Sequence, residues 1–210
     1  MKLAREGLAF VMALGVATLV VDLIGYWWVG LFLLVLTLAV ASFFRDPERE
    51  VPLGDHVVSP ADGRVVAIDR EVHAETVAGE PFQRVAIFMS PANVHVNRVP
   101  ASGEVISVTH TPGRFLAAYD ERSSNENERN EVVLRDLGGR LLVLVQVAGL
   151  LARRIVCNLR PGQRVEQGQR FGLIMFGSRV DVYVAPSARV LVRVGDRVRA
   201  GSAILAEYPV

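Results

Sequence analysis

The stretch Arg170-Phe-Gly-Leu-Ile-Met-Phe-Gly-Ser-Arg-Val-Asp181 contains an apolar, strand-like run that stops at a Gly-Ser pair and then resumes. Glycine tolerates backbone angles that other residues avoid, so a Gly-Ser pair between two strand-like runs predicts a bend or a bulge. After the pair the chain continues as Arg179-Val-Asp-Val-Tyr-Val184, which again has the composition of a strand. The stretch therefore indicates a β fold, with Gly177-Ser178 at a bend.

The chain after Val51 keeps this β character throughout. Short apolar runs are separated by glycine and proline, as in folds built from many short strands. Only Gly113–Ser124 predicts a short helix, and Glu121–Asn130 predicts a polar surface loop. The predicted strands are Gly63–Ile68, Arg84–Met89, Gly103–Thr109, Asn130–Leu134, Leu141–Val147, Phe171–Met175, Val180–Val184 and Ala188–Val194.

A weak internal repeat suggests how these strands are arranged. Gly162-Gln-Arg-Val-Glu-Gln-Gly168 matches Gly195-Asp-Arg-Val-Arg-Ala-Gly201, 33 residues further on. These segments resemble the turns of biotinyl and lipoyl carrier domains, and they predict a mainly β fold, a flattened barrel or sandwich of short strands. A carrier needs a lysine at a hairpin tip, and Lys2 is the only lysine, so a carrier function is excluded. A second family of related turns is Ser59-Pro-Ala-Asp-Gly-Arg-Val65, Val99-Pro-Ala-Ser-Gly-Glu-Val105 and Ala185-Pro-Ser-Ala-Arg-Val190.

The N-terminal segment is apolar enough to enter a membrane. From Gly7 to Phe44 only Asp22 is charged, and about 20 residues suffice to cross the hydrocarbon. The run therefore predicts two short helices, Gly7–Val21 and Trp27–Phe44, joined by a tight turn. Basic residues flank both ends, which places both ends and the following domain on the cytoplasmic side of the cell (inner) membrane. These basic residues are Lys2, Arg5, Arg45 and Arg49.

Two alternatives to this hairpin remain at this stage, a single tilted span and a hairpin that lies in one leaflet. A cleaved signal peptide is not supported, because no small-residue cleavage site follows a short apolar core. The sequence thus predicts two parts. Residues 1–50 form a membrane-anchoring helical hairpin with a charged linker, and residues 51–210 form a β-rich domain.

Composition excludes several function classes. A net charge of +1 creates no overall field for nucleic acid. Cys157 is the only cysteine, so no disulfide forms within the chain, and its apolar neighbours predict a small packed hydrophobe. No metal site is predicted, because the histidines lack the paired spacing of metal motifs. A Gly-x-Ser-x-Gly elbow and a phosphate-binding Gly-rich loop are also lacking.

Three segments carry residues that suit a reaction site. In Ser59-Pro-Ala-Asp-Gly63, Asp62 precedes a strand, although Asp-Gly is also ordinary turn chemistry. In Met89–Pro100, His95 stands among β-branched residues, with Asn93, Asn97 and Arg98 nearby. The third segment is Gly177-Ser178.

Together these segments make the chain resemble the phosphatidylserine decarboxylase family, in its short, archaeal-type form. The resemblance covers essentially the whole chain, and its most specific parts are the Phe-Gly-Ser-Arg-Val-Asp run and the Ser-Pro-Ala-Asp-Gly turn. Further matching segments are Phe43-Phe-Arg-Asp-Pro-Glu-Arg49, Pro112-Gly-Arg-Phe-Leu116, Asn125-Glu-Asn-Glu-Arg-Asn130 and Ala148-Gly-Leu-Leu-Ala-Arg-Arg-Ile155.

The resemblance implies an enzyme that matures by cutting itself between Gly177 and Ser178. Residues 1–177 become the β chain, and residues 178–210 become an α chain whose first residue, derived from Ser178, is a covalent pyruvoyl cofactor. That group forms a Schiff base with phosphatidylserine, which is decarboxylated to phosphatidylethanolamine in phospholipid biosynthesis. A pyruvoyl group also suits a chain whose only lysine, Lys2, is not suitable for holding pyridoxal phosphate.

The resemblance also implies roles for other residues. Asp62 and His95 are the candidates for activating the serine, and His95 also for reprotonating the substrate carbon. The longer relatives carry a second histidine where this chain has Arg98, so either His95 serves both steps or Asp62 acts with another partner. The anionic headgroup needs cations, for which the candidates are Arg98, Arg153, Arg154 and Arg179.

The implied partners are the membrane lipid and, after cleavage, the two chains of one precursor. Nucleic acid is not among them, and association into a homo-oligomer is compatible with the sequence. Two other hypotheses remain open at this stage. One is an archaetidylserine decarboxylase, with the same chemistry on ether-linked lipid, and the other is a membrane-tethered barrel without catalysis.

Overall fold

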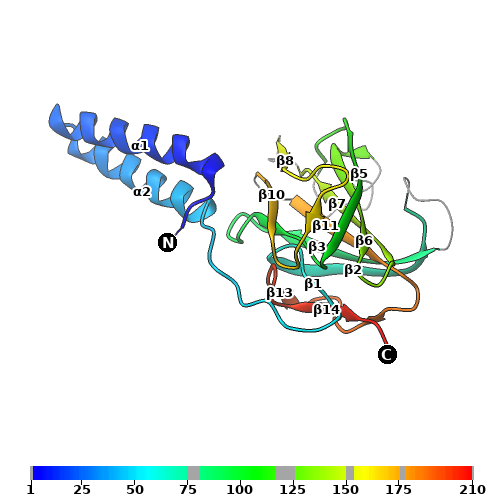
Figure 1. The fold of residues 1–210 in the computed structure, drawn as a ribbon. Helices are drawn as coiled ribbons and strands as arrows, with labels where there is room; N and C mark the ends of the chain where they lie inside the picture. The colour runs from blue at the N-terminus through cyan, green and yellow to red at the C-terminus, as the bar shows by residue number, and fades with distance from the viewer. Residues whose placement is uncertain (1, 75–80, 117–125, 150–153, 176–177, 210) are drawn as a thin grey trace. The chain divides into compact units, whose positions relative to one another are not determined.

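The structure is a computed structural model that describes residues 2–74, 81–116, 126–149, 154–175 and 178–209 (Figure 1). The chain divides into two compact units, Met1–Glu48 and Arg49–Val210. The first is helical and the second is built from strands.

The first unit is a pair of helices, as the sequence predicts. Helix α1 spans Arg5–Leu23 and helix α2 spans Trp27–Phe43. A tight turn joins them at Gly25, whose φ of 90° lies in the region that favours glycine. The side chain of Phe44 packs against Gly7, where a Cβ would come within 2.3 Å of the Phe44 ring. Gly7 therefore allows the end of the hairpin to close onto its beginning.

The surface of this helical unit is apolar. Helix α1 is long and apolar enough to cross a membrane, and α2 is a shorter apolar helix. Side chains of this kind on a surface fit hydrocarbon rather than water, so the unit indicates membrane association. Large apolar side chains that are exposed on the two helices include Leu8, Phe10, Met12, Leu19, Trp27, Phe32 and Leu38.

The second unit is organised around one eight-stranded antiparallel sheet that curls on itself (Figure 1). Its strand order is β13-β2-β3-β11-β7-β6-β5-β9, and two three-stranded sheets, β1-β14-β12 and β4-β10-β8, complete the unit. The main sheet comprises β2 (Gly63–Val72), β3 (Phe82–Met89), β5 (Gly103–Thr111), β6 (Arg129–Asp136), β7 (Leu141–Val147), β9 (Arg164–Val165), β11 (Ser178–Val184) and β13 (Arg197–Val198). The small sheets comprise β1 (His56–Val58), β14 (Ile204–Glu207), β12 (Arg189–Val190), β4 (Val96–Arg98), β10 (Arg170–Ile174) and β8 (Ile155–Cys157).

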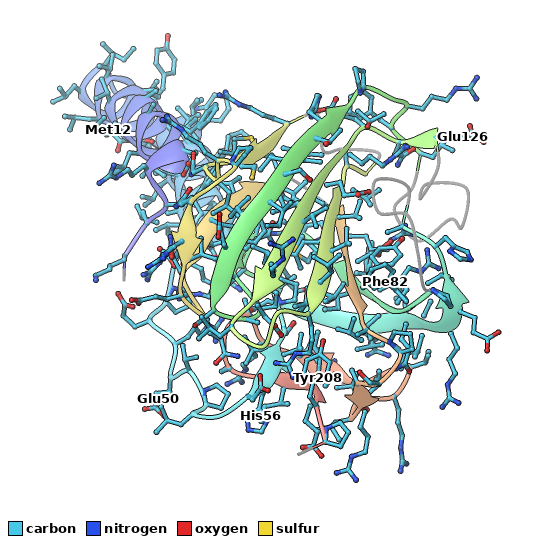
Figure 2. All side chains as sticks on the ribbon, turned by 45° about the vertical axis from the view of Figure 1, so that its right-hand side comes forward. Met12, Glu50, His56, Phe82, Glu126 and Tyr208 are labelled. Atoms are coloured by element: carbon cyan, nitrogen blue, oxygen red, sulfur yellow. The ribbon has the colours of Figure 1, made fainter. Side chains whose placement is uncertain are left out.

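The core lies on the inner face of the curled sheet. Val65, Ile87, Val180 and Leu144 belong to one large buried cluster with the inner residues of the small sheets. A second, smaller cluster on the other face includes Phe82, the first residue of β3, which Figure 2 labels. The sheet is therefore buried on both sides over part of its area, which explains strands such as β7 that read as continuous apolar runs.

The predicted mainly β fold is confirmed, with some differences in detail. Ala188–Val194 is predicted as one strand, but only Arg189–Val190 pairs, with β14. Residues 113–116 of the predicted short helix Gly113–Ser124 are not helical, and residues 117–124 lie outside the described part, so the helix itself stays a prediction. The last two residues of the predicted polar loop Glu121–Asn130 belong to β6, which begins at Arg129.

The internal repeat corresponds to two equivalent corners of the main sheet. Strand β13 pairs with the start of β2, and β9 pairs with the start of β5 in the same way. Val65 N–H donates to Asp196 O at 2.9 Å, and at the other corner Val105 N–H donates to Gln163 O at 2.9 Å. All four glycines that bound the repeated turns have a positive φ, between 75° and 100°. The repeat is therefore a structural one.

Candidate active site

Ser178 is the first residue of β11, in the middle of the main sheet. Its register partner on β3 is Met89. Because side chains alternate along a strand, Ser178 shares the inner, core-facing side of the sheet with Val180, while Arg179 points to the other side. The Ser178 side chain is fully buried, and its Oγ has no hydrogen-bond partner within the described part of the chain. A buried hydroxyl without a partner lowers the stability of the fold, so its presence here indicates a chemical role rather than a structural one.

His95 lies just before β4 and is also buried, with 2% of its surface exposed. Its Nδ1 lies 3.0 Å from the backbone carbonyl of Asn93. A carbonyl only accepts hydrogen bonds, so Nδ1 carries the proton of the neutral ring and Nε2 carries the lone pair. This arrangement orients the ring as a base that acts through Nε2.

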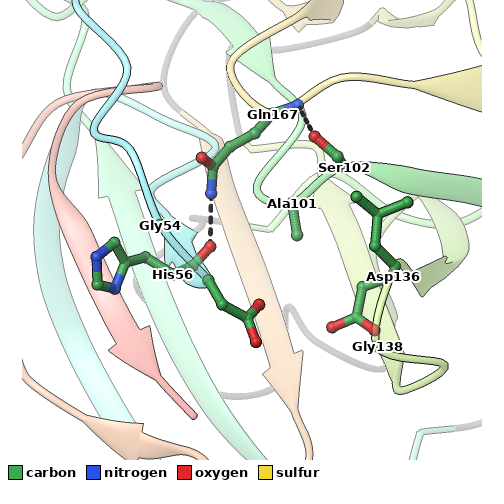
Figure 3. Close-up of a pocket in the computed structure, with 9 residues that line it drawn as sticks. Gly54, His56, Ala101, Ser102, Asp136, Gly138 and Gln167 are labelled. Atoms are coloured by element: carbon green, nitrogen blue, oxygen red, sulfur yellow. Dashed lines mark hydrogen bonds between the residues drawn. The ribbon is translucent and has the colours of Figure 1, made fainter. Parts of the chain in front are cut away.

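Asp62 is held at the corner where β2 meets β13. Its Oδ1 accepts a hydrogen bond from Ala200 N–H at 2.8 Å, and its Oδ2 pairs with Arg49 at 2.7 Å. At the equivalent corner, Ser102 Oγ accepts a hydrogen bond from Gln167 N–H at 2.9 Å (Figure 3). Binding the turn is therefore a structural role that a hydroxyl can also fill. The second carboxylate oxygen, which pairs with Arg49, is particular to Asp62.

The structure brings the three segments together. Arg98 N–H donates to Pro60 O at 2.9 Å, which ties β4 to the Ser-Pro-Ala-Asp-Gly turn. Asn97 Nδ2 lies 3.7 Å from the Sδ of Met89, the register partner of Ser178. The segments of Asp62, His95 and Ser178 thus meet at the end of β3.

A cavity of about 750 Å³ adjoins this meeting point. Its wall includes Asp62, Asn93, and Phe88 and Ser90, the two neighbours of Met89. Phe88 stands in one cross-strand row with Arg64 and Arg179, so this part of the wall faces the side of the sheet opposite Ser178. The same wall carries three arginines, Arg64, Arg197 and Arg199.

Arg179, one of the arginines that the sequence suggests for the substrate headgroup, binds a carboxylate of the protein instead. Arg179 forms a two-pronged ion pair with Asp181 at 2.7 and 3.0 Å, on the opposite side of the sheet from Ser178. Burial raises the pKa of the Asp181 carboxyl, and the guanidinium groups of Arg179 and Arg84 oppose that rise. Arg179 therefore neutralises a buried carboxylate.

Arg98 and Arg154 also have structural surroundings. The guanidinium of Arg98 donates to the backbone carbonyl of Gly168 at 2.9 Å and packs against Gly201, so it joins the two repeated turns. Arg154 is exposed, and its backbone carbonyl accepts a hydrogen bond from Met175 N–H. Arg153 and Gly177 lie outside the described residues. The roles given to these residues from the sequence stay predictions.

A chain of buried amides, which sequence reasoning missed, links β4 to the main sheet. Asn130 donates to Gln146 Oε1 at 3.1 Å, and Gln146 Nε2 donates to Asn97 Oδ1 at 2.9 Å. All three side chains are almost completely buried. Gln146 is the register partner of Val180, two residues from Ser178. The chain of amides therefore fixes the strand that follows His95 against the strands beside Ser178.

Replacing Gln146 with leucine should destabilise the protein by about 2–4 kcal/mol, because it leaves one buried amide acceptor and one buried donor unpaired. Chemical unfolding of the detergent-solubilised chain measures this loss. Gln169→Leu is the control, because it removes a single exposed hydrogen bond to Glu166 N–H and should cost less than about 1 kcal/mol. Equal losses in the two variants would show that the amide chain contributes nothing special.

Cys157 packs against the core as a partly buried hydrophobe, as the sequence predicts. Burial raises the pKa of its thiol above the ordinary value, and contacts with Leu159 and Asn130 only partly offset this. The nucleophilic form of cysteine is the thiolate, so the raised pKa disfavours a catalytic role.

Cys157 in the folded protein should therefore react with iodoacetamide at pH 8 at least about 10-fold more slowly than in the urea-unfolded chain. The mass of the labelled protein over time measures both rates. The same rate in both states would contradict the buried, protonated thiol.

The second repeated corner has a cavity of its own, of about 390 Å³ (Figure 3). Ser102 and Gln167 line it, in the places that Asp62 and Ala200 take at the first corner. Its acidic residues Asp55 and Asp136 are both bound by Arg140, at 2.6 and 2.7 Å. The two corners thus share a backbone design and differ in their charged groups.

Comparison with known proteins is consistent with this site. The profile of the family described as phosphatidylserine decarboxylase matches residues 36–206. A protein of Syntrophus aciditrophicus is 44% identical over 98% of this chain and 97% of its own length, and one of Pelobacter propionicus is 47% identical over 97% and 95%. A third, of Geotalea uraniireducens, is 46% identical over 99% and 97%. All three are named phosphatidylserine decarboxylase proenzyme.

Proposed function

Because this chain belongs to the phosphatidylserine decarboxylase family, we propose that it converts phosphatidylserine to phosphatidylethanolamine and carbon dioxide after cutting itself at Gly177-Ser178. The observation that carries this function is the Ser178 hydroxyl, which is fully buried and has no hydrogen-bond partner among the described residues. The relatives that support it match nearly the full chain, and their name, proenzyme, implies processing.

Self-cleavage uses the chain's own atoms. Ser178 Oγ loses its proton to a base and attacks the Gly177 carbonyl, so an ester replaces the peptide bond. Elimination then breaks the ester bond at Ser178, releases the carboxylate of Gly177 and leaves dehydroalanine. Water converts the dehydroalanine into a pyruvoyl group and free ammonia. Glycine suits the attacked position, because it has no side chain to obstruct the hydroxyl.

His95 is the base that best fits these steps. Its Nδ1 is held by the Asn93 carbonyl, so its Nε2 is the nitrogen that can take up a proton. Asp62 is engaged by Ala200 N–H and Arg49, and this surrounding suits a charged group that supports the site rather than one that moves a proton. We therefore assign proton transfer to His95 and electrostatic support to Asp62.

Decarboxylation needs an acceptor for the electrons of the breaking carbon–carbon bond. The pyruvoyl carbonyl supplies that acceptor, and the buried position of Ser178 suits such a group. His95 returns a proton to the substrate carbon after carbon dioxide leaves. Burial of His95 and Ser178 keeps water from competing for that carbon.

The helical unit serves as the membrane anchor in this proposal. The substrate is a membrane lipid, and α1 is long and apolar enough to enter the bilayer. Residues 1–50 then hold the β-rich domain, residues 51–210, at the membrane surface. The basic residues on both sides of the apolar segment favour the cytoplasmic side for this domain. After cleavage, the β chain and the α chain stay together because β11 lies between β3 and β7.

The direct test is release of labelled carbon dioxide from carboxyl-labelled phosphatidylserine by the purified full chain. We expect carbon dioxide and phosphatidylethanolamine in equal amounts, and we expect hydroxylamine, which condenses with carbonyl groups, to stop the release. An ether-linked analogue run in parallel separates this substrate from archaetidylserine. A processed protein that releases no carbon dioxide from either lipid would contradict the proposed function.

A further inference from the structure

Asn97 on β4 has a buried amide whose donor end meets only a weak acceptor. The residue is completely buried. Within the described part of the chain, the one acceptor that its Nδ2 contacts is the Sδ of Met89, at 3.7 Å. A thioether sulfur accepts hydrogen bonds weakly, and an amide nitrogen carries two hydrogens. Asn97 therefore keeps donor capacity that the described residues do not use, although burying such capacity costs stability.

The chain of buried amides sets the orientation of this group. Gln146 Nε2 lies 3.5 Å from the backbone carbonyl of Val156, which can only accept, so the nitrogen of the Gln146 amide is at this end. The same nitrogen donates to Asn97 Oδ1 at 2.9 Å. The oxygen of the Asn97 amide is thus turned toward Gln146, and its nitrogen is turned toward Met89.

The Asn97 amide lies over β11, on the side of the sheet that carries Ser178. Its two ends contact side chains of β3 and β7, and these two strands flank β11. Met89 is the register partner of Ser178, and the Cβ atoms of such partners are about 4.5–5.5 Å apart. Gln146 is the register partner of Val180, the next residue of β11 on the same face. The unused donor therefore lies beside the Ser178 Oγ, which is itself buried without a partner among the described residues.

We propose that Asn97 Nδ2 donates a hydrogen bond to the Ser178 oxygen while the ester of the self-cleavage reaction breaks. In this elimination a base takes the Cα proton of Ser178, and the electron pair of the Cβ–Oγ bond goes to Oγ. That oxygen leaves as part of the Gly177 carboxylate, so negative charge grows on it inside a buried site. A donor that is already in place stabilises such a charge far more than it stabilises the uncharged ester.

This inference rests on the proposed function, and its test follows the maturation of the full chain in detergent after cell-free synthesis. Asn97→Leu removes the donor and keeps the approximate size of the side chain. We expect formation of the pyruvoyl chain to slow about 10²–10³-fold, the usual loss for one such donor, and the ester to accumulate.

Hydroxylamine reveals that ester, because it attacks the Gly177 carbonyl and releases the serine hydroxyl. Brief treatment of Asn97→Leu should therefore yield a shorter chain, residues 178–210, that begins with an intact serine. Mass spectrometry separates this chain from one that begins with a pyruvoyl group or its oxime. An ester forms only where Ser178 can reach its target, so the trapped chain also shows that the variant has folded.

Two matched controls separate this role from a structural one. Asn130→Leu breaks the amide chain at its other end, on β6, which is two strands away from β11. Met89→Leu conserves volume and removes the sulfur that Asn97 contacts. Both controls should mature within about 2-fold of the unchanged rate and give no chain that begins with serine. Asn97→Ala, made in parallel, removes the same donor without bulk, and circular dichroism verifies the fold of each variant.

Maturation of both Asn97 variants at the unchanged rate would overturn the inference, and so would slow maturation without a trapped ester. Equal slowing in Asn130→Leu or Met89→Leu, or loss of the fold in both Asn97 variants, would show that the amide is only structural. Failure of the proposed function is distinguishable from all of these, because the unchanged chain itself would then stay uncut or release no carbon dioxide.

Discussion

Ser178→Ala should leave the protein as one uncut 23.0-kDa chain without decarboxylase activity. Alanine lacks the oxygen that attacks the Gly177 carbonyl, so neither the ester nor the pyruvoyl group can form. Gel electrophoresis of the purified variant measures cutting, and carbon dioxide release measures activity. We expect both to fall below detection, a loss of at least about 10⁴-fold in rate.

The structure offers a matched control for this variant. Ser187 lies in the same C-terminal segment, is exposed, and is remote from the buried end of β11. Ser187→Ala should be cut and should decarboxylate like the unchanged chain. Because alanine at position 178 is close in size to serine, the variant should also keep its fold, which circular dichroism can verify. Cutting of the Ser178→Ala chain at the same bond would refute the assignment of Ser178.

His95→Asn should slow maturation and decarboxylation by about 10²–10⁴-fold, which is the usual contribution of a positioned acid or base. An asparagine side chain can still donate to the Asn93 carbonyl, so the local hydrogen bond is kept while the basic Nε2 is lost. The half-time of cutting after synthesis and the rate of carbon dioxide release measure the two steps separately.

His110 provides the control for His95. It lies on β5, and about half of its side chain is exposed. His110→Asn should mature and react at the unchanged rate. If His95→Asn matured and reacted as fast as this control, His95 would not be the proton carrier. If it matured normally but decarboxylated slowly, the base for cutting would be a different residue.

Much of the fold follows from the spacing of apolar residues and glycines. Leu141–Val147 is a strand with the predicted bounds, and the repeated Gly-x-Arg-Val turns occupy equivalent corners. Strands β1, β4, β8 and β14 were not predicted. Each is four residues or shorter, so local periodicity carries little signal for it.

The candidate site was predictable in part. The motif around Ser178 and the segments of Asp62 and His95 pointed to one place, and the structure brings these segments together. The arginines were harder, because a sequence does not show which charges are compensated. Arg179 meets Asp181 two residues later on the same strand face, a signal that was present in the sequence.

The sequence also distinguishes the arginines that line the 750 Å³ cavity, but only when the two copies of the internal repeat are compared. Aligning the two corners places Arg64 and Arg199 where the other copy has Glu104 and Glu166. That contrast gains meaning once the register shows which residues face each other. The amide chain had a weaker signal, because Gln146 is a single polar residue in an apolar strand.

The mass of the intact purified protein reports cutting at Gly177-Ser178 and formation of the pyruvoyl group together. We expect two chains, residues 1–177 and the 33 residues 178–210. The shorter chain should be lighter than its amino-acid sequence by the difference between serine and a pyruvoyl group, which is the mass of one ammonia. A single chain with the full mass of 23.0 kDa, or a shorter chain that begins with an intact serine, would contradict this processing.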